Sequence, residues 1–279
     1  MKKNRSGKGL KLTENKLFFS LFLMILSLIL FLNATYAWTS FAKWRRNHMQ
    51  GNEEIIVPSA LIEGKLDGVV LNPGQLTQRE VIVTNTSLKP VVIRVKLTEI
   101  LALLEIDTTD QTGNGHLAEY QDLGSKSLLK VDVPGSWKAM NYFSTNGQAP
   151  FYQVAGIATY PYLNSQTGRP SEFAPISFTW GAIKDTNSSE DDFWLYQEQA
   201  GVGYFYYSDL LEKGESTTVL IDEMQVSNEA PNSFKGALHR LDVQAEAGEA
   251  SKGVYGAWNI QETVDNPVYQ RFEQILSGH

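Results

Sequence analysis

Few of the residue types that usually carry catalysis occur in this chain. It has no cysteine and four histidines, His48, His116, His239 and His279. The His-Glu-x-x-His pattern of a helical zinc site does not occur, nor does the Gly-x-Ser-x-Gly elbow of a serine hydrolase. Without cysteine there is no thiol nucleophile, thiolate metal site or disulfide. We therefore expect no enzymatic activity and no cofactor, and we interpret His239, beside Arg240, as an exposed polar residue on a strand.

A carboxylate cluster lies in the acidic segment 187–192. Glu190, Asp191 and Asp192 are adjacent, and Ca²⁺ takes several carboxylate or carbonyl oxygens in a fixed geometry. The spaced ligands of an EF-hand loop are missing, so we favour a solvated loop and keep these three residues as weak metal candidates. Glu190 and Asp192 could also serve as the paired acids of a glycosidase, whose required separation the sequence does not give.

The N-terminal segment has the three parts of a secretory signal peptide. Basic residues precede the mostly apolar run 17–32, and Thr35-Tyr36-Ala37 places small side chains at the two positions that a signal peptidase reads. The run is shorter than the ~20 residues of a spanning helix. We predict a signal peptide over residues 1–37, with cleavage between Ala37 and Trp38 at a site marked by Thr35. The alternative is an uncleaved anchor that uses residues 33–41 to lengthen the apolar segment.

The charge balance argues against nucleic acid as a partner. The whole chain has a formal charge of −7, and residues 1–37 hold six basic residues and one acid, so their removal leaves a charge near −12. A protein this acidic is not drawn to nucleic acid or to an anionic membrane by bulk charge. We expect membrane contact only through an uncleaved signal segment. An exported protein without cysteine also fits a Gram-positive cell surface.

The segment 38–52 after the predicted cleavage site is an aromatic leader. Trp38, Phe41 and Trp44 lie outside any core pattern. One interpretation is a flexible leader whose aromatic rings tuck onto the domain. The other is an extended assembly strand that pairs with the sheet edge of another molecule, because an exposed aromatic edge strand without a partner is prone to aggregate.

From residue 53 onward, short apolar runs alternate with turns, which predicts one all-β domain over residues 53–279. Two segments have a clean period of two, typical of strands with one buried and one mostly wet face. Asn85-Thr86-Ser87 marks a turn, either in a hairpin or between two sheets. The pattern favours an antiparallel β-sandwich over a layout that alternates strands with helices. Strands are expected at Ile55–Val57, Glu80–Thr84, Val91–Thr98, Val131–Val133, Trp137–Phe143, Phe151–Val154, Ile176–Trp180, Phe193–Tyr196, Gly203–Tyr207, Ser216–Asp222 and residues 237–247.

Other segments complete the expected domain. Residues 107–126 are polar and glycine-rich, which predicts a long surface loop. Asn266-Pro267 predicts the start of a short C-terminal helix, with proline in the first helical position. Large aromatic residues are expected mainly in the core, and the alternative is that they face a glycan or a host protein. These residues are Trp137, Trp180, Trp194 and the run Tyr204–Tyr207.

Three ordered parts of the chain match a known family. They are the junction Ala34–Trp38, the turns and strands of Leu71–Gly74, Val81–Thr86 and Pro90–Val95, and the C-terminal segments Gly203–Tyr207, Leu211–Thr218 and Val243–Trp258. In this order they resemble the TasA, camelysin and BsaA group of exported biofilm-matrix proteins of Gram-positive bacteria, with the BsaA branch the most similar. The export of that group depends on a SipW-type signal peptidase.

The resemblance implies a jelly-roll-like sandwich that is secreted and polymerises into extracellular matrix fibres. In that group the N-terminal segment can insert as a donor strand into the next subunit. The expected partners are therefore further copies of this chain, the signal peptidase during export, and other matrix components. The alternative function is a monomeric surface module that binds polysaccharide or a host protein.

Overall fold

Two long strands joined by a polar turn organise the fold. They are β3 (Leu76–Asn85) and β4 (Val91–Leu104). The buried Asn85 side chain holds the turn, because its Oδ1 accepts from the Ser87 backbone N–H at 2.8 Å and its Nδ2 donates to the carbonyls of Lys89 and Leu211. β3 and β4 belong to different sheets. Of the two alternatives for the predicted turn, the connection between sheets is therefore correct.

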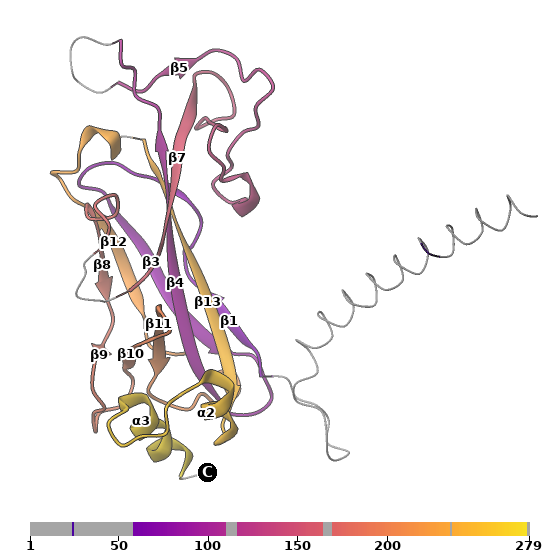
Figure 1. The fold of residues 1–279 in the computed structure, drawn as a ribbon, viewed down its shortest axis with the longest axis vertical. Helices are drawn as coiled ribbons and strands as arrows, with labels where there is room; N and C mark the ends of the chain where they lie inside the picture. The colour runs from indigo at the N-terminus through magenta and orange to yellow at the C-terminus, as the bar shows by residue number, and fades with distance from the viewer. Residues whose placement is uncertain (1–23, 25–57, 110–115, 164–168, 235, 278–279) are drawn as a thin grey trace, which may run out of the picture. The chain divides into compact units, whose positions relative to one another are not determined.

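The computed structural model describes residues 24, 58–109, 116–163, 169–234 and 236–277 (Figure 1). The chain divides into two units, Met1–Ile55 and Ile56–His279. The predicted signal peptide, the cleavage site, the leader and the strand expected at Ile55–Val57 fall outside the described residues, apart from Met24. Within the described ranges, no helix combines the length and the apolar character needed to cross a bilayer.

The strands form two sheets, and every strand pairing is antiparallel except that of β9 with β10. The smaller sheet has the order β1-β3-β12-β8, and the larger has the order β2-β13-β4-β11-β10-β9, with β7 beside β4 and with β5 and β6 beside β7. The predicted all-β sandwich is thus confirmed. The further strands are β1 (Ala60–Glu63), β2 (Val69–Val70), β5 (Glu119–Tyr120), β6 (Tyr142–Phe143), β7 (Phe151–Pro161), β8 (Ile176–Trp180), β9 (Ile183–Lys184), β10 (Trp194–Gln199), β11 (Val202–Tyr207), β12 (Ile221–Val226) and β13 (Leu238–Glu249).

The main core lies between the two sheets. Alternate residues of β4, such as Ile93 and Val95, meet Val81 and Val83 of β3 and Ile221 of β12 in one buried cluster. Burying this apolar surface is the main favourable term of folding. The same cluster includes Leu241, with Val243, Ala245 and Ala247 packed against it, which confirms the dry face predicted for residues 237–247.

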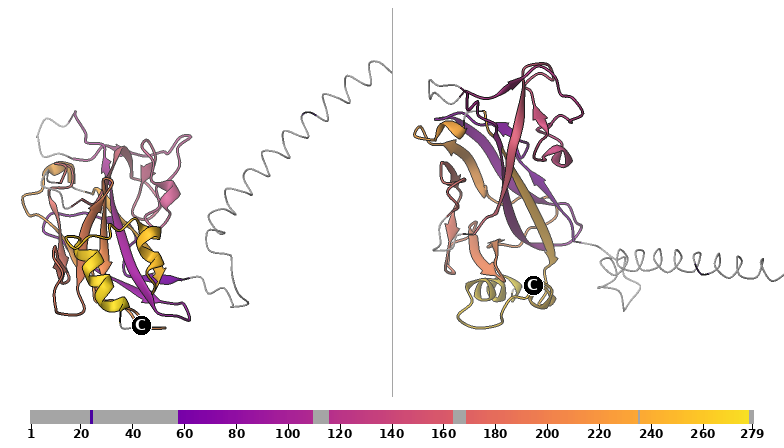
Figure 2. Two further views of the ribbon diagram at one scale, coloured as in Figure 1. Left: turned by 60° about the horizontal axis from the view of Figure 1, so that its bottom comes forward. Right: turned by 45° about the horizontal axis from the view of Figure 1, so that its top comes forward.

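Two helices cover the outer face of the larger sheet at one end, as Figures 1 and 2 show. They are α2 (Gly253–Trp258) and α3 (Pro267–Leu276). Their apolar residues, among them Trp258 and Phe272, bury Val92 of β4 and Tyr206 of β11. The face of β4 opposite the main core was predicted to be mostly wet. At the start of the strand this prediction is wrong, because the helices bury Val92.

The predicted C-terminal helix α3 is confirmed, and its start has the expected chemistry. The Oδ1 of Asn266 accepts from the backbone N–H groups of Val268 and Tyr269, and Pro267 occupies the first turn. A buried arginine then fixes the helix to the sheet. Arg271 bonds Asp191 at 2.7 Å and Asp209 at 2.9 Å, and it donates to the carbonyl of Ser208.

Several predicted boundaries are wrong for identifiable reasons. Residues 131–133 form a turn before the 3₁₀ helix η1 (Pro134–Ser136), where Pro134 ends any strand pairing. The strand expected at Ser216–Asp222 begins only at Ile221. Residues 216–220 form the connection that precedes β12, and they make isolated hydrogen bonds to β3. The β10–β11 turn is tighter than expected, since only Ala200 and Gly201 lie in it, both with positive φ. The loop expected near 107–126 contains β5, and η2 (Asn232–Phe234) precedes β13.

The packing of α3 on the sheet predicts a large effect of one core substitution. Phe272→Ala should lower the free energy of unfolding by about 3–5 kcal/mol, because it leaves a cavity against Trp258 and Tyr206. Urea unfolding followed by circular dichroism measures this change. Gln274→Ala, on the exposed side of the same helix, is the control and should shift stability by under about 0.5 kcal/mol. Equal effects of the two substitutions would contradict the described packing.

Candidate functional site

His239 is buried, so its interpretation as an exposed residue is wrong. Its side chain and that of Glu99 have no exposed area, and His239 Nε2 lies 3.2 Å from Glu99 Oε2. Arg169 pairs with both oxygens of Glu99. Arg79 Nη2 lies 3.3 Å from His239 Nδ1. We call Arg79, Glu99, Arg169 and His239 the buried charge cluster.

The partners of His239 determine its tautomer. An arginine can only donate, so Nδ1 accepts from Arg79 and the Nε2–H group donates to Glu99. Burial lowers the pKa of His239 below its ordinary value, and burial likewise lowers the pKa of Arg79 to about 10, which leaves the guanidinium charged at neutral pH. Arg79 comes from β3, whereas Glu99 and His239 come from β4 and β13. The cluster therefore bonds one sheet to the other.

The buried charge cluster bonds chain segments to one another, and its histidine and carboxylate lie away from the surface. A general acid or base needs to reach a substrate proton, and neither Glu99 nor His239 has an exposed side-chain atom. Arg79 also donates to the carbonyls of Lys65 at 2.6 Å and Asp67 at 3.0 Å, which holds the connection between β1 and β2.

The three weak metal candidates point to different partners. Glu190 pairs with Lys184, Asp191 pairs with Arg271, and Asp192 accepts from the Tyr207 hydroxyl at 2.7 Å. Within the described ranges, no group of three histidine, aspartate or glutamate side chains is placed to hold a metal ion. The segment instead connects α3, the β9–β10 region and β11.

The outer edge of β13 pairs with another strand only at its beginning, although β1 of the smaller sheet lies near it. β2 pairs only with Leu238 and His239. The Ala237 carbonyl accepts from the Leu71 N–H on the β2 side, and alternate residues of a strand point their backbone groups the same way. Leu241, Val243, Ala245 and Ala247 therefore direct their N–H and C=O groups outward, and no described residue bonds to them. We call this stretch the open edge.

The candidate assembly residues Trp38, Phe41 and Trp44, and the cleavage residues Thr35 and Ala37, lie outside the described residues. The aromatic residues predicted to lie in the core differ in how deeply they are buried. Trp194 is fully buried and Trp137 nearly so, while Trp180 and Tyr204 are half-buried. Trp180 stacks on Phe205 between the sheets, whereas Tyr204 lines a cavity on the outer face.

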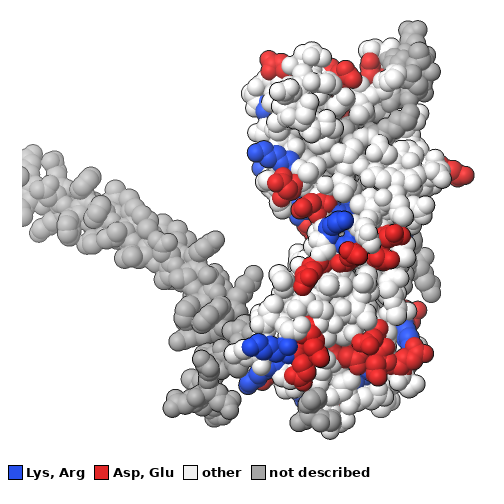
Figure 3. Space-filling view, turned by 180° about the vertical axis from the view of Figure 1, so that it is seen from behind, with Lys and Arg blue, Asp and Glu red and all other residues white. Residues whose placement is uncertain are grey.

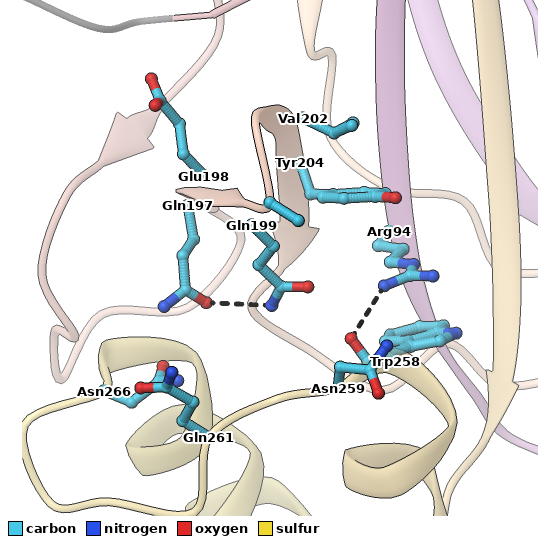
Figure 4. Close-up of a pocket in the computed structure, with 11 residues that line it drawn as sticks. Arg94, Gln197, Glu198, Gln199, Val202, Tyr204, Trp258, Asn259, Gln261 and Asn266 are labelled. Atoms are coloured by element: carbon cyan, nitrogen blue, oxygen red, sulfur yellow. Dashed lines mark hydrogen bonds between the residues drawn. The ribbon is translucent and has the colours of Figure 1, made fainter.

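That cavity has a volume of about 440 Å³ and a wall made of stacked planar groups (Figure 4). The Arg94 guanidinium lies between the rings of Tyr204 and Trp258, at 4.4 and 4.8 Å from their centroids. Glu246 binds Arg94 at 2.6 and 2.9 Å, and Arg94 also donates to the Trp258 carbonyl. We call the cavity the amide pocket, because its other lining residues include Gln197, Gln199, Asn259, Gln261 and Asn266.

Sequence reasoning missed the amide pocket because its residues come from four separate segments. In the observed β10–β11 hairpin, Gln197, Gln199 and Tyr204 share one face, with the register Gln197↔Tyr204. The expected strand ended at Tyr196 and so left both glutamines out. The loop that carries Gln261 and Asn266 reaches this face only because α2 and α3 fold back over the sheet.

The surface in Figure 3 has interspersed charge. On this face acidic side chains gather in the middle and lower parts of the view with basic side chains among them, and its described residues form no continuous basic surface. Comparisons with protein-family models, with curated proteins and with solved structures find no match to this chain.

The buried charge cluster predicts a pH dependence of stability. Because the pKa of His239 is lower in the folded chain than in the unfolded chain, the unfolded state binds more protons below about pH 6.5. Stability should be full above that pH and fall as the pH drops through the folded pKa, by at most about 1.4 kcal/mol per pH unit from this group. Urea unfolding at pH 7, 6 and 5 measures the slope.

His239→Gln supplies the comparison for this pH dependence, because glutamine can still donate to Glu99 but does not titrate. The difference in stability between the variant and the parent chain should shrink as the pH falls from 7 toward 5. Parallel curves for the two proteins would show that His239 does not carry the effect.

Proposed function

We propose that this chain is an exported structural subunit that assembles into extracellular matrix fibres, by adding its N-terminal leader as an extra strand to β13 of the next subunit. The observation that supports the proposal is the open edge. Leu241, Val243, Ala245 and Ala247 offer four backbone donors and four acceptors without a described partner. Such an edge is a template for strand addition from another chain.

The leader is long enough to cover the open edge. Residues 38–47 in extended form span about 33 Å, and residues 240–249 of β13 span the same distance. In an extended strand, successive side chains point to opposite faces, so Trp38, Ala42 and Trp44 would share one face of the leader. This face would extend the dry side of β13, beside Val243 and Ala245.

The other face of the leader carries charge that suits β13. Lys43 and Arg45 share this face, and the wet side of β13 carries Asp242 and Glu246, which also pair with Arg240 and Arg94. Opposite charges on neighbouring strands stabilise pairing. The same register places Trp38 and Trp44 on the dry side, whereas Phe41 lies on the charged face.

Strand donation from one subunit to the next is a head-to-tail contact that does not close, so it produces a filament. Cleavage after Ala37 would release the leader only after export, which keeps assembly outside the cell. The partners in this proposal are copies of the same chain, the signal peptidase during export, and other matrix components. The second candidate function is a monomeric module that binds polysaccharide, which the amide pocket favours.

Removing the leader should abolish assembly. The chain from Trp38 to His279 should form filaments, and the chain from Gly51 onward, which retains the unit Ile56–His279, should stay monomeric. Light scattering and negative-stain electron microscopy at matched concentrations measure the difference. Monomers of both lengths at high concentration, with or without Ca²⁺, would contradict strand donation by the leader.

A proline in the open edge tests the acceptor side. Val243→Pro removes an outward N–H but no bond to β4, so the fold should persist while the edge loses its donor. We expect the concentration needed for filaments to rise at least about tenfold, since a lost hydrogen bond and a blocked edge together exceed ~1.4 kcal/mol. Val243→Ala keeps the N–H and is the matched control. Ala247→Pro should repeat the effect, and filaments that form normally from both proline variants would place the acceptor elsewhere.

A further inference from the structure

The amide pocket has the chemistry of a binding site for a neutral, hydroxyl-rich ligand. Figure 4 shows Gln197 and Gln199 of β10 directed toward Gln261 and Asn266 of the loop before α3. These four side chains come from two segments and converge on one cavity. Its volume of about 440 Å³ lies within the range of small-molecule sites, about 300–1,000 Å³.

Much of the hydrogen-bonding capacity in the pocket is not taken up by other protein groups and faces solvent. The side-chain amides of Asn259 and Gln261 make no hydrogen bond to any described residue. Asn266 is 6% exposed, and its Oδ1 caps α3 while its Nδ2 has no described partner. The contact from Gln199 Nε2 to Gln197 Oε1 is 3.5 Å long and therefore weak. Each amide offers both a donor and an acceptor, as does each hydroxyl of a sugar.

The charges of the pocket argue for a neutral ligand. Arg94 is paired with Glu246 and enclosed between Tyr204 and Trp258, so its charge is largely balanced within the protein. Glu198 at the margin accepts from the Tyr196 hydroxyl and would repel an anion. The stack of Tyr204, Arg94 and Trp258 forms a rigid wall, and an apolar ring face can pack on the face of Tyr204 that Arg94 does not cover.

We infer that the amide pocket binds a neutral oligosaccharide, with the amides of Gln199, Gln261 and Asn266 bonded to its hydroxyl groups and a sugar ring beside Tyr204. The inference does not depend on fibre formation. It assigns a ligand class to the outer face of the larger sheet, whereas the open edge lies along the margin of that sheet at β13.

The test is a titration of the chain from Trp38 onward with neutral trisaccharides, namely chitotriose, maltotriose, cellotriose and xylotriose. Calorimetry measures binding, and ¹⁵N-resolved NMR follows the side-chain amide groups of Gln199, Gln261 and Asn266. At least one neutral trisaccharide should saturate and shift these signals. The double variant Gln199→Ala/Gln261→Ala should weaken that binding at least about tenfold.

Matched controls distinguish the pocket from general effects. Gln225→Ala and Gln274→Ala alter exposed glutamines on β12 and α3 and should leave binding unchanged. Gln261→Leu, which fills the pocket without removing a core residue, provides a second variant with the expected loss. Trigalacturonate and a glutamine-containing peptide are the anionic and amide probes, and neither should compete.

Three results would overturn the inference. One is the absence of any shift at the pocket amides with all four neutral trisaccharides at millimolar concentration. Another is binding that the double variant and Gln261→Leu leave unchanged. The third is saturation by trigalacturonate or by the peptide alone, which would assign the pocket to a different ligand class. Filament formation by the chain from Trp38 onward is scored separately, so the two proposals can fail independently.

Discussion

The pairing of β4 with β13 is the constraint on which the rest of the structure depends. Twelve consecutive residue pairs, from Leu238↔Ala102 to Glu249↔Val91, hold one register without a bulge. Because side chains alternate between faces, a shift of one residue would move the dry face of one strand to the side of the sheet opposite the dry face of the other. The register also sets Arg94 opposite Glu246 and brings His239 within reach of Glu99. The core, the amide pocket and the buried charge cluster thus share one alignment.

Three buried arginines connect the layers of the fold. Apolar packing alone would fix the relative positions of these layers less closely. Arg79 joins the two sheets, Arg94 joins β4 to the segment after α2, and Arg271 joins α3 to the loops of the larger sheet. A buried guanidinium is costly unless its donors are satisfied. Each of the three bonds at least one backbone carbonyl, which constrains the position of a chain segment as well as that of a side chain. These contacts place the helices and the connections that frame the pocket.

Local patterns in the sequence predicted the parts of the fold that depend on local physics. Three features were predictable because each follows from a local rule. They are the alternation in residues 237–247, from its period of two; the strand Ile176–Trp180, from strand propensity; and the cap of α3 at Asn266, from helix-capping chemistry. The burial of His239 could also have been predicted from the sequence. Residues 239 and 241 of a strand point to the same face, and Leu241 was assigned to the dry face. Helix α2 was not predictable, since its six residues include two glycines and it is held by packing of Val254 and Trp258 close to Gly248. The amide pocket needed that packing, which no local pattern contains.

The β4–β13 pairing also orders events in time. It joins residues near position 100 to residues near position 240, so the loop that closes when they meet spans about half of the chain. Pairing over such a separation is slow, and it cannot begin before β13 has been synthesised or has crossed a membrane. Until then β4 has no neighbour on that side, Arg94 has no Glu246, and neither the open edge nor the amide pocket exists. In a chain that emerges N-terminus first, the open edge and the amide pocket therefore form only after residues 249 and 266, respectively, have emerged.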